Sequence, residues 1–330
     1  MEHKLYPLKF KPVLMDKIWG GTKIKDVLGI DFEPLPNCGE AWTLSGVEEH
    51  PTTVSNGFLE GNELNELVEI YMGDLTGDVI YNRFGNEFPI LVKFINAADW
   101  LSIQVHPDDE LAAKRGQPNG KTEMWYILAA DNGSELITGF KRDSSPAEYL
   151  QYLKEKKLTD ILNREIVKAG DVFFMPAGRV HALGPGILLA EIQQTSDTTY
   201  RIYDWDRKDD EGNSRELHLD EALEAIDFKA HDDYKAKYRE VKNSSSNMVS
   251  SPYFNTNIIV IDKTIAKDYS ELDSFVIYIC IEGELTIVHD GEEEKQVSLS
   301  KGETALIPAI IDRIDLIPSK ESKILEVFII

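Results

Sequence analysis

The sequence predicts a mainly β protein with short inserted helices, and two observations support this prediction. Apolar and polar residues alternate along short runs such as residues 8–14, and glycine or proline residues separate many of these runs, which is typical of strands joined by turns. From Pro252 to Ile330 the chain consists of one short strand pattern after another. Apolar residues with helical spacing are confined to a few segments, so we expect helices only as insertions.

The first part of the chain contains predicted strands at residues 8–14 and 39–45, followed by a helical pattern at residues 60–83. Residues 87–95 then form a predicted buried strand that contains a single lysine, Lys93. A lysine in so apolar a run either reaches water from a strand end or is placed for a function. The pattern alone leaves both possibilities open.

Gln104 and His106 lie two positions apart in an extended stretch. Side chains with this spacing leave the same face of a strand, so the amide and the imidazole are expected to point into one space. Pro107 has no backbone N–H and ends regular pairing directly after the histidine. A loop at residues 116–120 then returns the chain as a strand that starts at Glu123, whose carboxylate can lie beside His106.

A second imidazole comes from His181, which follows a predicted buried strand and a Pro/Gly turn. Gln104, His106, Glu123 and His181 make a mixed nitrogen and oxygen set that suits Zn²⁺ and several other divalent ions. A lone histidine in a strand is more often a surface residue or a hydrogen-bonded core residue. The spacing of Gln104 and His106 is therefore weak evidence by itself, and the four donors together favour a metal site.

The middle of the chain contains further helical patterns. A hydroxyl cap before a proline predicts a helix at residues 146–157, with a second short helix that ends at Arg164. Another helix is predicted at residues 215–226, so His218 is expected to be a surface residue at its start. Residues 231–251 are polar and charged and are interpreted as a linker.

Residues 300–309 repeat the pattern of residues 168–177, which suggests that the chain contains two related β units. His181 follows the first copy, but Arg313 stands at the equivalent position after the second. The second copy therefore keeps the strand and turn pattern but lacks the histidine. His289 stands apart from any other candidate ligand in the sequence.

A length of 330 residues is typical of two domains. We expect a metal-binding domain with helical insertions at residues 1–240 and a β-rich domain without metal ligands at residues 241–330.

The formal charge of −23 excludes some classes of partner. Nucleic acid and anionic membranes would be repelled, so neither is expected to bind. A phosphorylated substrate would need a local cluster of lysine and arginine side chains. A well-solvated surface is the simplest explanation of the acidity itself.

The two cysteines, Cys38 and Cys280, are far apart in the sequence and neither belongs to a C-x-x-C pair. This pattern fits free thiols in a reducing compartment. The N-terminus has no long apolar region, and no apolar run reaches the ~18 residues that a membrane-spanning helix needs. We therefore expect a cytoplasmic protein without a signal peptide.

The segment from Leu101 to Pro107 resembles a hallmark of the type I mannose-6-phosphate isomerases, and the likeness extends well beyond it. Trp19-Gly20-Gly21, Gly39-Glu40-Ala41-Trp42 and a lysine upstream of the Gln-Val-His-Pro strand also match. Residues 176–181 are similar to the second motif of the cupin superfamily. Residues 199–204 are similar to a pattern of the short bacterial form.

This resemblance implies a fold of cupin, or jelly-roll, β-barrels, with the catalytic domain at residues 1–240 and a cupin-like C-terminal domain at residues 241–330. It implies that the enzyme interconverts mannose 6-phosphate and fructose 6-phosphate through an enediol. The implied cofactor is one Zn²⁺ per chain, and the implied ligands are Gln104, His106, Glu123 and His181.

The resemblance also implies catalytic residues. Arg201 is expected to stabilise the enediolate or to order the substrate, because a guanidinium stays charged and forks onto paired oxygens. Lys93 and Lys121 are expected to hold phosphate or to move the proton, and a lysine beside a bound cation should have a lowered pKa. Glu191 and Asp197 are further candidates for the base. The sequence does not choose among these four, and Glu191 is equally a candidate for holding a ligand histidine.

Two other classes of function remain open at this point. A non-catalytic sugar-binding or regulatory cupin would be expected to lack a ligand or Arg201, and all of them are present. Another cupin enzyme, such as a different sugar isomerase or an oxygenase, is the second alternative. The chain is shorter than the long forms of the family, and Lys121-Thr122-Glu123 stands where they have K-P-E. Strict preference for mannose 6-phosphate is therefore not predicted.

Overall fold

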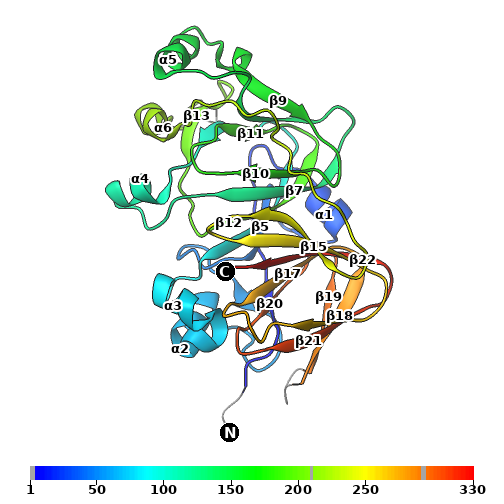
Figure 1. The fold of residues 1–330 in the computed structure, drawn as a ribbon. Coiled ribbons are helices and arrows are strands. Elements are labelled where there is room, and N and C mark those ends of the chain that lie inside the picture. The colour runs from blue at the N-terminus through cyan, green and yellow to red at the C-terminus, as the bar shows by residue number, and fades with distance from the viewer. Residues whose placement is uncertain (1–3, 209–210, 291–294) are drawn as a thin grey trace.

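The structure of the protein is a computed structural model that describes residues 4–208, 211–290 and 295–330. Within these ranges the chain forms four antiparallel sheets with short helices between the strands (Figure 1). The prediction of a mainly β protein with short inserted helices is therefore confirmed. No helix in the described ranges is long and apolar enough to cross a lipid bilayer.

Two of the sheets make up the half of the molecule that contains the predicted metal ligands. The six-stranded sheet has the order β10 (Val172–Met175), β7 (Glu123–Ala130), β12 (Ile187–Gln194), β5 (Ile90–Ala97), β3 (Glu40–Leu44) and β2 (Val13–Met15). The five-stranded sheet has the order β13 (Tyr200–Tyr203), β6 (Ile103–Val105), β11 (His181–Leu183), β8 (Glu135–Phe140) and β9 (Leu162–Ile166).

The other half contains the C-terminal strands. The seven-stranded sheet has the order β14 (Ser245–Ser250), β15 (Asn255–Ile261), β22 (Ser322–Phe328), β17 (Val276–Glu282), β20 (Thr304–Ile307), β1 (Leu8–Lys11) and β4 (Thr53–Val54). The four-stranded sheet has the order β16 (Ile265–Asp268), β21 (Arg313–Pro318), β18 (Glu284–His289) and β19 (Gln296–Ser300).

The beginning of the chain belongs to the sheet of its end. Leu8 of β1 is opposite Leu306 of β20, and Phe10 of the same strand is opposite Val54 of β4. The two halves of the molecule are thus joined by strand pairing as well as by the connection before β14. The division between residues 240 and 241 stays a prediction, and these pairings show that the N-terminal strand crosses it.

The helices are short and lie outside the sheets. They are α1 (Lys23–Leu28), α2 (Leu64–Thr76), α3 (Asp78–Phe84), α4 (Asp109–Lys114), α5 (Pro146–Lys154), α6 (Leu219–Ala225) and the 3₁₀ turn η1 (Leu158–Asp160). Figure 1 shows α4, α5 and α6 along one side of the half with the predicted site, and α2 and α3 beside the other half. Gly77, with φ of 95°, separates α2 from α3, and the Asp273 carboxylate accepts hydrogen bonds from the first backbone N–H groups of α3.

Two of the sequence predictions are corrected by the structure. The expected short helix ending at Arg164 is replaced by η1 and strand β9, because residues 162–166 pair with β8 and exposed residues alternate with less exposed ones along them. The serine-rich end of the expected linker at residues 231–251 forms the edge strand β14. Met248 and Val249 are both buried, and the pairing of β14 with β15 shifts register between Asn247 and Val249.

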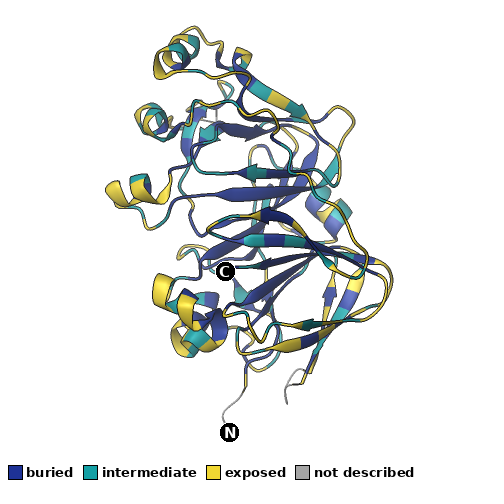
Figure 2. Ribbon diagram, viewed as in Figure 1, coloured by how far each residue is buried: buried dark blue, intermediate teal, exposed yellow. Residues whose placement is uncertain are grey.

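A continuous apolar core joins the two halves. Every residue of β5 and β12 is buried, whereas the helices expose one face (Figure 2). The largest core cluster contains Leu44 and Phe94 from one half together with Phe275 and Leu306 from the other. The rings of Phe88 and Phe275 lie 4.6 Å apart across this junction. We conclude that the two halves share one core and do not pack as separate bodies.

A buried carboxylate, Glu326, organises a polar cluster inside the C-terminal half. Its Oε1 atom lies 2.6 Å from Lys267 Nζ and accepts a hydrogen bond from the Tyr269 hydroxyl at 2.6 Å. Its Oε2 atom accepts hydrogen bonds from Ser245 Oγ and Asn257 Nδ2. Burial by itself would raise the pKa of Glu326, but Lys267 and the hydrogen bond from Asn257 outweigh burial and hold the pKa below its ordinary value.

We expect Glu326→Ala to lower the free energy of unfolding by about 3 kcal/mol, because it leaves the mostly buried Lys267 without its partner. Because folding lowers the pKa of Glu326, its contribution is present at neutral pH and is lost as the pH falls below about 4.5. Urea unfolding at pH 7 and at pH 3.5 measures both effects, and the difference between wild type and variant should shrink at the lower pH. Glu321→Ala, at an exposed carboxylate paired with Lys242, should change stability by less than about 0.5 kcal/mol. Equal effects of the two variants would contradict this account.

Candidate metal centre

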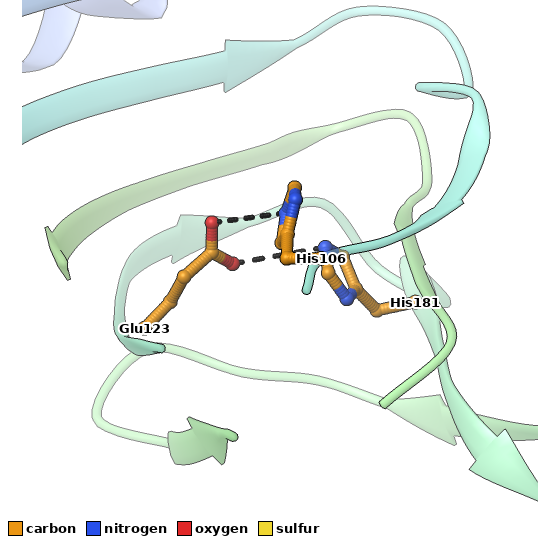
Figure 3. A group of neighbouring side chains, drawn as sticks. All are labelled: His106, Glu123 and His181. Atoms are coloured by element: carbon orange, nitrogen blue, oxygen red, sulfur yellow. Dashed lines mark ion pairs between the residues drawn. The ribbon is translucent and has the colours of Figure 1, made fainter. Parts of the chain in front are cut away.

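Three predicted ligands meet in one buried cluster. His106 follows β6, Glu123 is the first residue of β7, and His181 is the first residue of β11. His106 Nε2 lies 3.2 Å from Glu123 Oε1, and His181 Nε2 lies 3.7 Å from Glu123 Oε2. Figure 3 shows the two rings facing the carboxylate. One donor atom from each residue lies within 4.8 Å of the other two, so a single cation could contact all three.

The turn between β10 and β11 brings these residues together because it crosses from one sheet to the other. Met175, at the end of β10, is opposite Glu123 in the six-stranded sheet, and His181 is opposite Gln104 in the five-stranded sheet. Gly178 in this turn has φ of 86° and donates its N–H to the His106 carbonyl at 2.9 Å. A β-carbon at Gly178 would also lie 2.9 Å from the Ala225 carbonyl oxygen, so the turn requires glycine.

Both histidines present an unprotonated nitrogen to the cluster. The Nδ1 atoms of His106 and His181 lie 2.8 Å from the carbonyl oxygens of Thr198 and Arg179, respectively. Carbonyls only accept hydrogen bonds, so each Nδ1 carries the hydrogen and each Nε2 keeps a lone pair. Burial, reinforced by Lys121, lowers the pKa of His106 to about 3, and burial also lowers the pKa of His181. The rings are neutral, which is the form that binds metals.

The cluster fits a cation because it leaves buried donor atoms without partners. His106 Nε2 and Glu123 Oε2 are both buried and make no hydrogen bond within the described residues. Burial by itself would raise the pKa of Glu123, but the positive charge of Lys121 opposes burial, and the pKa lies well below its ordinary value. A carboxylate and two imidazole lone pairs directed at one point are a typical divalent-metal donor set.

Gln104, the fourth predicted ligand, lies beside this cluster. Its side-chain Nε2 is 3.4 Å from His181 Nε2, and Ser102 Oγ lies 3.5 Å from its Oε1. Rotation of the amide by half a turn would exchange its oxygen and nitrogen. Gln104 therefore lies where a ligand is expected, but its amide nitrogen, and not the oxygen that would bind a metal, faces the cluster.

A cavity of about 310 Å³ opens between the two sheets beside this cluster, and two rows of side chains face it. In the six-stranded sheet, strand register aligns Lys93, Glu191 and Trp125 in one row. In the five-stranded sheet, Arg201, Gln104 and His181 form the facing row. Directly opposed residues place their side chains on the same face of a sheet, which explains how residues far apart in the chain share this cavity.

All five predicted catalytic residues line the cavity: Lys93, Lys121, Glu191, Asp197 and Arg201. Lys93 and Glu191 are buried in its wall, and Asp197 is exposed. Arg201 is half-buried, and its Nη1 donates to the Glu216 carbonyl at 2.9 Å.

Lys93 lies among two carboxylates and an aromatic ring. Its Nζ lies 3.8 Å from Glu40 Oε2 and 3.9 Å from Glu191 Oε1, and 4.3 Å from the centre of the Trp42 ring. The alternative that Lys93 reaches water from a strand end is therefore wrong, because its side chain is only 4% exposed and lies in the middle of β5.

Glu191 is anchored by a tryptophan. Its Oε2 accepts a 2.6 Å hydrogen bond from Trp125 Nε1. Burial and the nearby charge of Glu123 raise its pKa to about 7. The alternative that Glu191 holds a ligand histidine is not what the structure shows, because backbone carbonyls occupy both Nδ1 atoms.

Lys121 lies 3.0 Å from Glu123 Oε1. Burial favours its neutral form, but the carboxylates of Glu123, Glu191 and Asp197 outweigh burial and raise its pKa. The protein groups alone therefore raise the pKa of Lys121, whereas a bound cation is expected to lower it.

Sequence reasoning missed three charged residues of the cavity: Lys17, Glu40 and Arg215. Glu40 accepts a 2.7 Å hydrogen bond from Trp42 Nε1, and Lys17 Nζ lies 3.6 Å away. The Gly39-Glu40-Ala41-Trp42 motif was the available signal, since it contains a charged residue in an otherwise apolar strand. Arg215 was expected at the start of a helix, where a charged residue is ordinary, so nothing in the sequence singled it out. The helix in fact begins at Leu219, and residues 215–218 precede it.

The fold and the cluster together define a class: a β-barrel protein of the cupin type with a candidate metal centre inside one barrel. Comparison with known families agrees with this class and narrows it. The family described as phosphomannose isomerase type I, catalytic domain, matches residues 7–144, and the mannose-6-phosphate isomerase cupin domain matches residues 244–319. The chain belongs to the type I phosphomannose isomerase family, so it is an enzyme of the isomerase class.

Individual relatives support this assignment. The chain is 34% identical to a mannose-6-phosphate isomerase of Streptococcus mutans over 92% of its own length and 93% of the relative's. It is 42% identical to the mannose-6-phosphate isomerase ManA of Bacillus subtilis over 67% of its own length and 68% of the relative's. The crystal structure of the mannose 6-phosphate isomerase from Bacillus subtilis matches with a TM-score of 0.87 and 32% identity, covering 99% of this chain and all of that one. The predicted cupin fold and the family resemblance are confirmed.

Proposed function

We propose that the protein interconverts mannose 6-phosphate and fructose 6-phosphate through an enediol, with the help of one bound metal ion. The observation that supports this most strongly is the shared cavity. A cluster of two neutral imidazoles and a carboxylate lies beside a pocket whose wall also carries Lys93, Lys121 and Arg201. Isomerisation of an aldose to a ketose needs positive charge at two adjacent oxygens and a group that moves a proton between their carbons.

The proposed ligands of the ion are Gln104, His106, Glu123 and His181, and the donor set suits Zn²⁺. When bound, the ion would act as a Lewis acid toward substrate oxygens that gain negative charge. A single carboxylate among neutral donors would leave net positive charge at the site.

Arg201 is the proposed group that stabilises the enediolate or orders the sugar. It lines the cavity opposite the Lys93 row, and its Nε is buried without a hydrogen-bond partner among the described residues. A guanidinium with free donors can bind an oxygen anion in a fixed geometry. Removing such a donor raises the barrier because the charge develops only in the transition state.

Proton transfer is assigned to the wall of the cavity. Lys93, Lys121, Glu191 and Asp197 all reach it, and each is a proposed general acid or base. The pair of Lys93 and Glu191 is buried on adjacent strands, so it keeps a fixed geometry during turnover.

A protein with a formal charge of −23 repels an anionic substrate unless cationic side chains surround the binding site, and the cavity contains such side chains. Five cationic side chains line it and outnumber the three carboxylates of Glu40, Glu191 and Asp197: Lys17, Lys93, Lys121, Arg201 and Arg215. This local cluster is what a sugar phosphate requires against an acidic background. We propose the cytoplasm as the compartment, where the free thiols Cys38 and Cys280 would stay reduced.

The function is tested by incubating the purified, metal-loaded protein with mannose 6-phosphate in D₂O. We expect fructose 6-phosphate to form and to carry solvent deuterium at C1, because an enediol exchanges its proton with the base and the solvent. Mannose without phosphate should react much more slowly. Binding of the sugar phosphate without turnover would identify a non-catalytic cupin and contradict the proposal.

A further inference from the structure

Arg201 lies on the open edge of a sheet, and a four-residue segment covers that edge. Strand β13 is the last strand of the five-stranded sheet, and β6 occupies its other side. An edge strand leaves backbone N–H and C=O groups without strand partners. Residues 215–218, here called the strap, lie along this edge and supply partners to Arg201.

His218 bonds both backbone groups of Arg201. Its own N–H donates to the Arg201 carbonyl at 2.8 Å, and its Nδ1 lies 3.1 Å from the Arg201 nitrogen, where it accepts the N–H. The ring is therefore used as an acceptor, although sequence reasoning expected a surface residue. His218 precedes α6 but makes no side-chain capping bond to that helix. Its ring accepts a hydrogen bond from strand β13 and does not cap helix α6.

The same strap holds the other end of Arg201. The Glu216 carbonyl accepts a 2.9 Å hydrogen bond from Arg201 Nη1. Arg215 donates from Nε and Nη2 to the two carboxylate oxygens of Asp204, which follows β13. The strap is therefore bonded to the strand at its backbone, at the guanidinium of Arg201 and at Asp204.

Helix α6 gives the strap a rigid support. The carbonyl of His218 accepts the Ala222 N–H at 2.9 Å, which begins the first turn. Ala222 and Ile226 are buried in one apolar cluster with Val105 and Tyr200, which flank the paired residues of β6 and β13. Because the helix packs on the same strands that carry Gln104 and Arg201, it fixes His218 relative to the cavity.

We propose that His218 is a positioning residue: its Nδ1 acceptor fixes the backbone of Arg201 so that the guanidinium faces the cavity. The catalytic consequence of this role rests on the proposed function, whereas the contact itself does not. Two substitutions of nearly equal shape separate the acceptor from the packing. Asn places an oxygen near the position of Nδ1, and Leu places a methyl group there.

The contact is tested by hydrogen exchange at the Arg201 amide, observed by NMR in ¹⁵N-arginine-labelled protein. We expect exchange about tenfold faster in His218→Leu than in wild type, and near wild type in His218→Asn, since one hydrogen bond is lost or kept. His231→Leu, at a half-exposed histidine outside the cavity, should leave this amide unchanged. Equal exchange in wild type and His218→Leu would overturn the proposal.

The role in the reaction is tested by a double-mutant cycle. We expect His218→Leu to lower kcat about tenfold with little change in KM, and His218→Asn to restore most of it. In an Arg201→Ala background, His218→Leu should have almost no further effect on kcat, because no guanidinium is left to position. Independent, multiplying losses would overturn the positioning role. An inactive wild type would instead contradict the proposed function, and the exchange experiment would still decide the contact.

Discussion

His106→Ala is expected to remove the bound metal and the isomerase activity together. The neutral His106 ring offers Nε2 to the cluster, and no other described residue can replace it there. If the ion supplies about 4 kcal/mol of transition-state stabilisation, its loss lowers kcat/KM on the order of a thousandfold. Metal analysis by mass spectrometry and turnover of mannose 6-phosphate, measured on the same preparations, check the two expectations.

His231→Ala is the matched control, because His231 lies outside the cavity with a side chain that is 43% exposed. It should retain full metal content and activity. Chelation of the wild type should reproduce the His106→Ala result, and added Zn²⁺ should restore the chelated wild type but not the variant. Activity that survives removal of the metal would refute the metal-dependent mechanism.

Arg201→Lys is expected to lower kcat by about a hundredfold while leaving the metal content unchanged. The substitution keeps the positive charge but loses the planar fork, and it loses the donor that reaches the Glu216 carbonyl. Arg201 does not contact the three clustered donors, so the metal should remain bound. Loss of one preorganised donor to a developing oxyanion has an effect of this size.

Arg313→Lys provides the control for this second variant. Arg313 stands at the position that corresponds to His181 in the internal repeat, but its side chain is 71% exposed and pairs with Asp268. We expect no change in kcat from that substitution. If Arg201→Lys also keeps wild-type kcat, the assignment of Arg201 to enediolate stabilisation is wrong.

Local sequence patterns predicted the individual ligand residues of the site better than the residues that surround them. The two-residue spacing of Gln104 and His106, and the turn before His181, are short-range features that a sequence displays directly. Only the family resemblance predicted that these residues meet. Their meeting requires the β10–β11 turn to cross from one sheet to the other, which no local pattern indicates. The hydrogen bond from Trp125 to Glu191 depends on the register of β7 and β12, which no local pattern encodes.

Weak patterns explain the errors. The edge strand β14 is rich in serine and asparagine, so its alternation is hidden among polar residues. The use of His218 as an acceptor for a strand edge depends on how α6 packs, which involves residues that look like an ordinary amphipathic helix. Charged residues that stand alone in the sequence, such as Arg215, reveal a role only through the partner that the fold gives them.

The pairing of β1 with β20 has a consequence for how the protein is made. The first strand leaves the ribosome long before its partner is synthesised, since nearly the whole chain separates Leu8 from Leu306. Contacts between such distant segments close late and slow folding. The barrel that carries the candidate metal centre therefore cannot complete this attachment until β20 has been synthesised, and a nascent chain that has not reached β20 would expose an apolar strand to its neighbours.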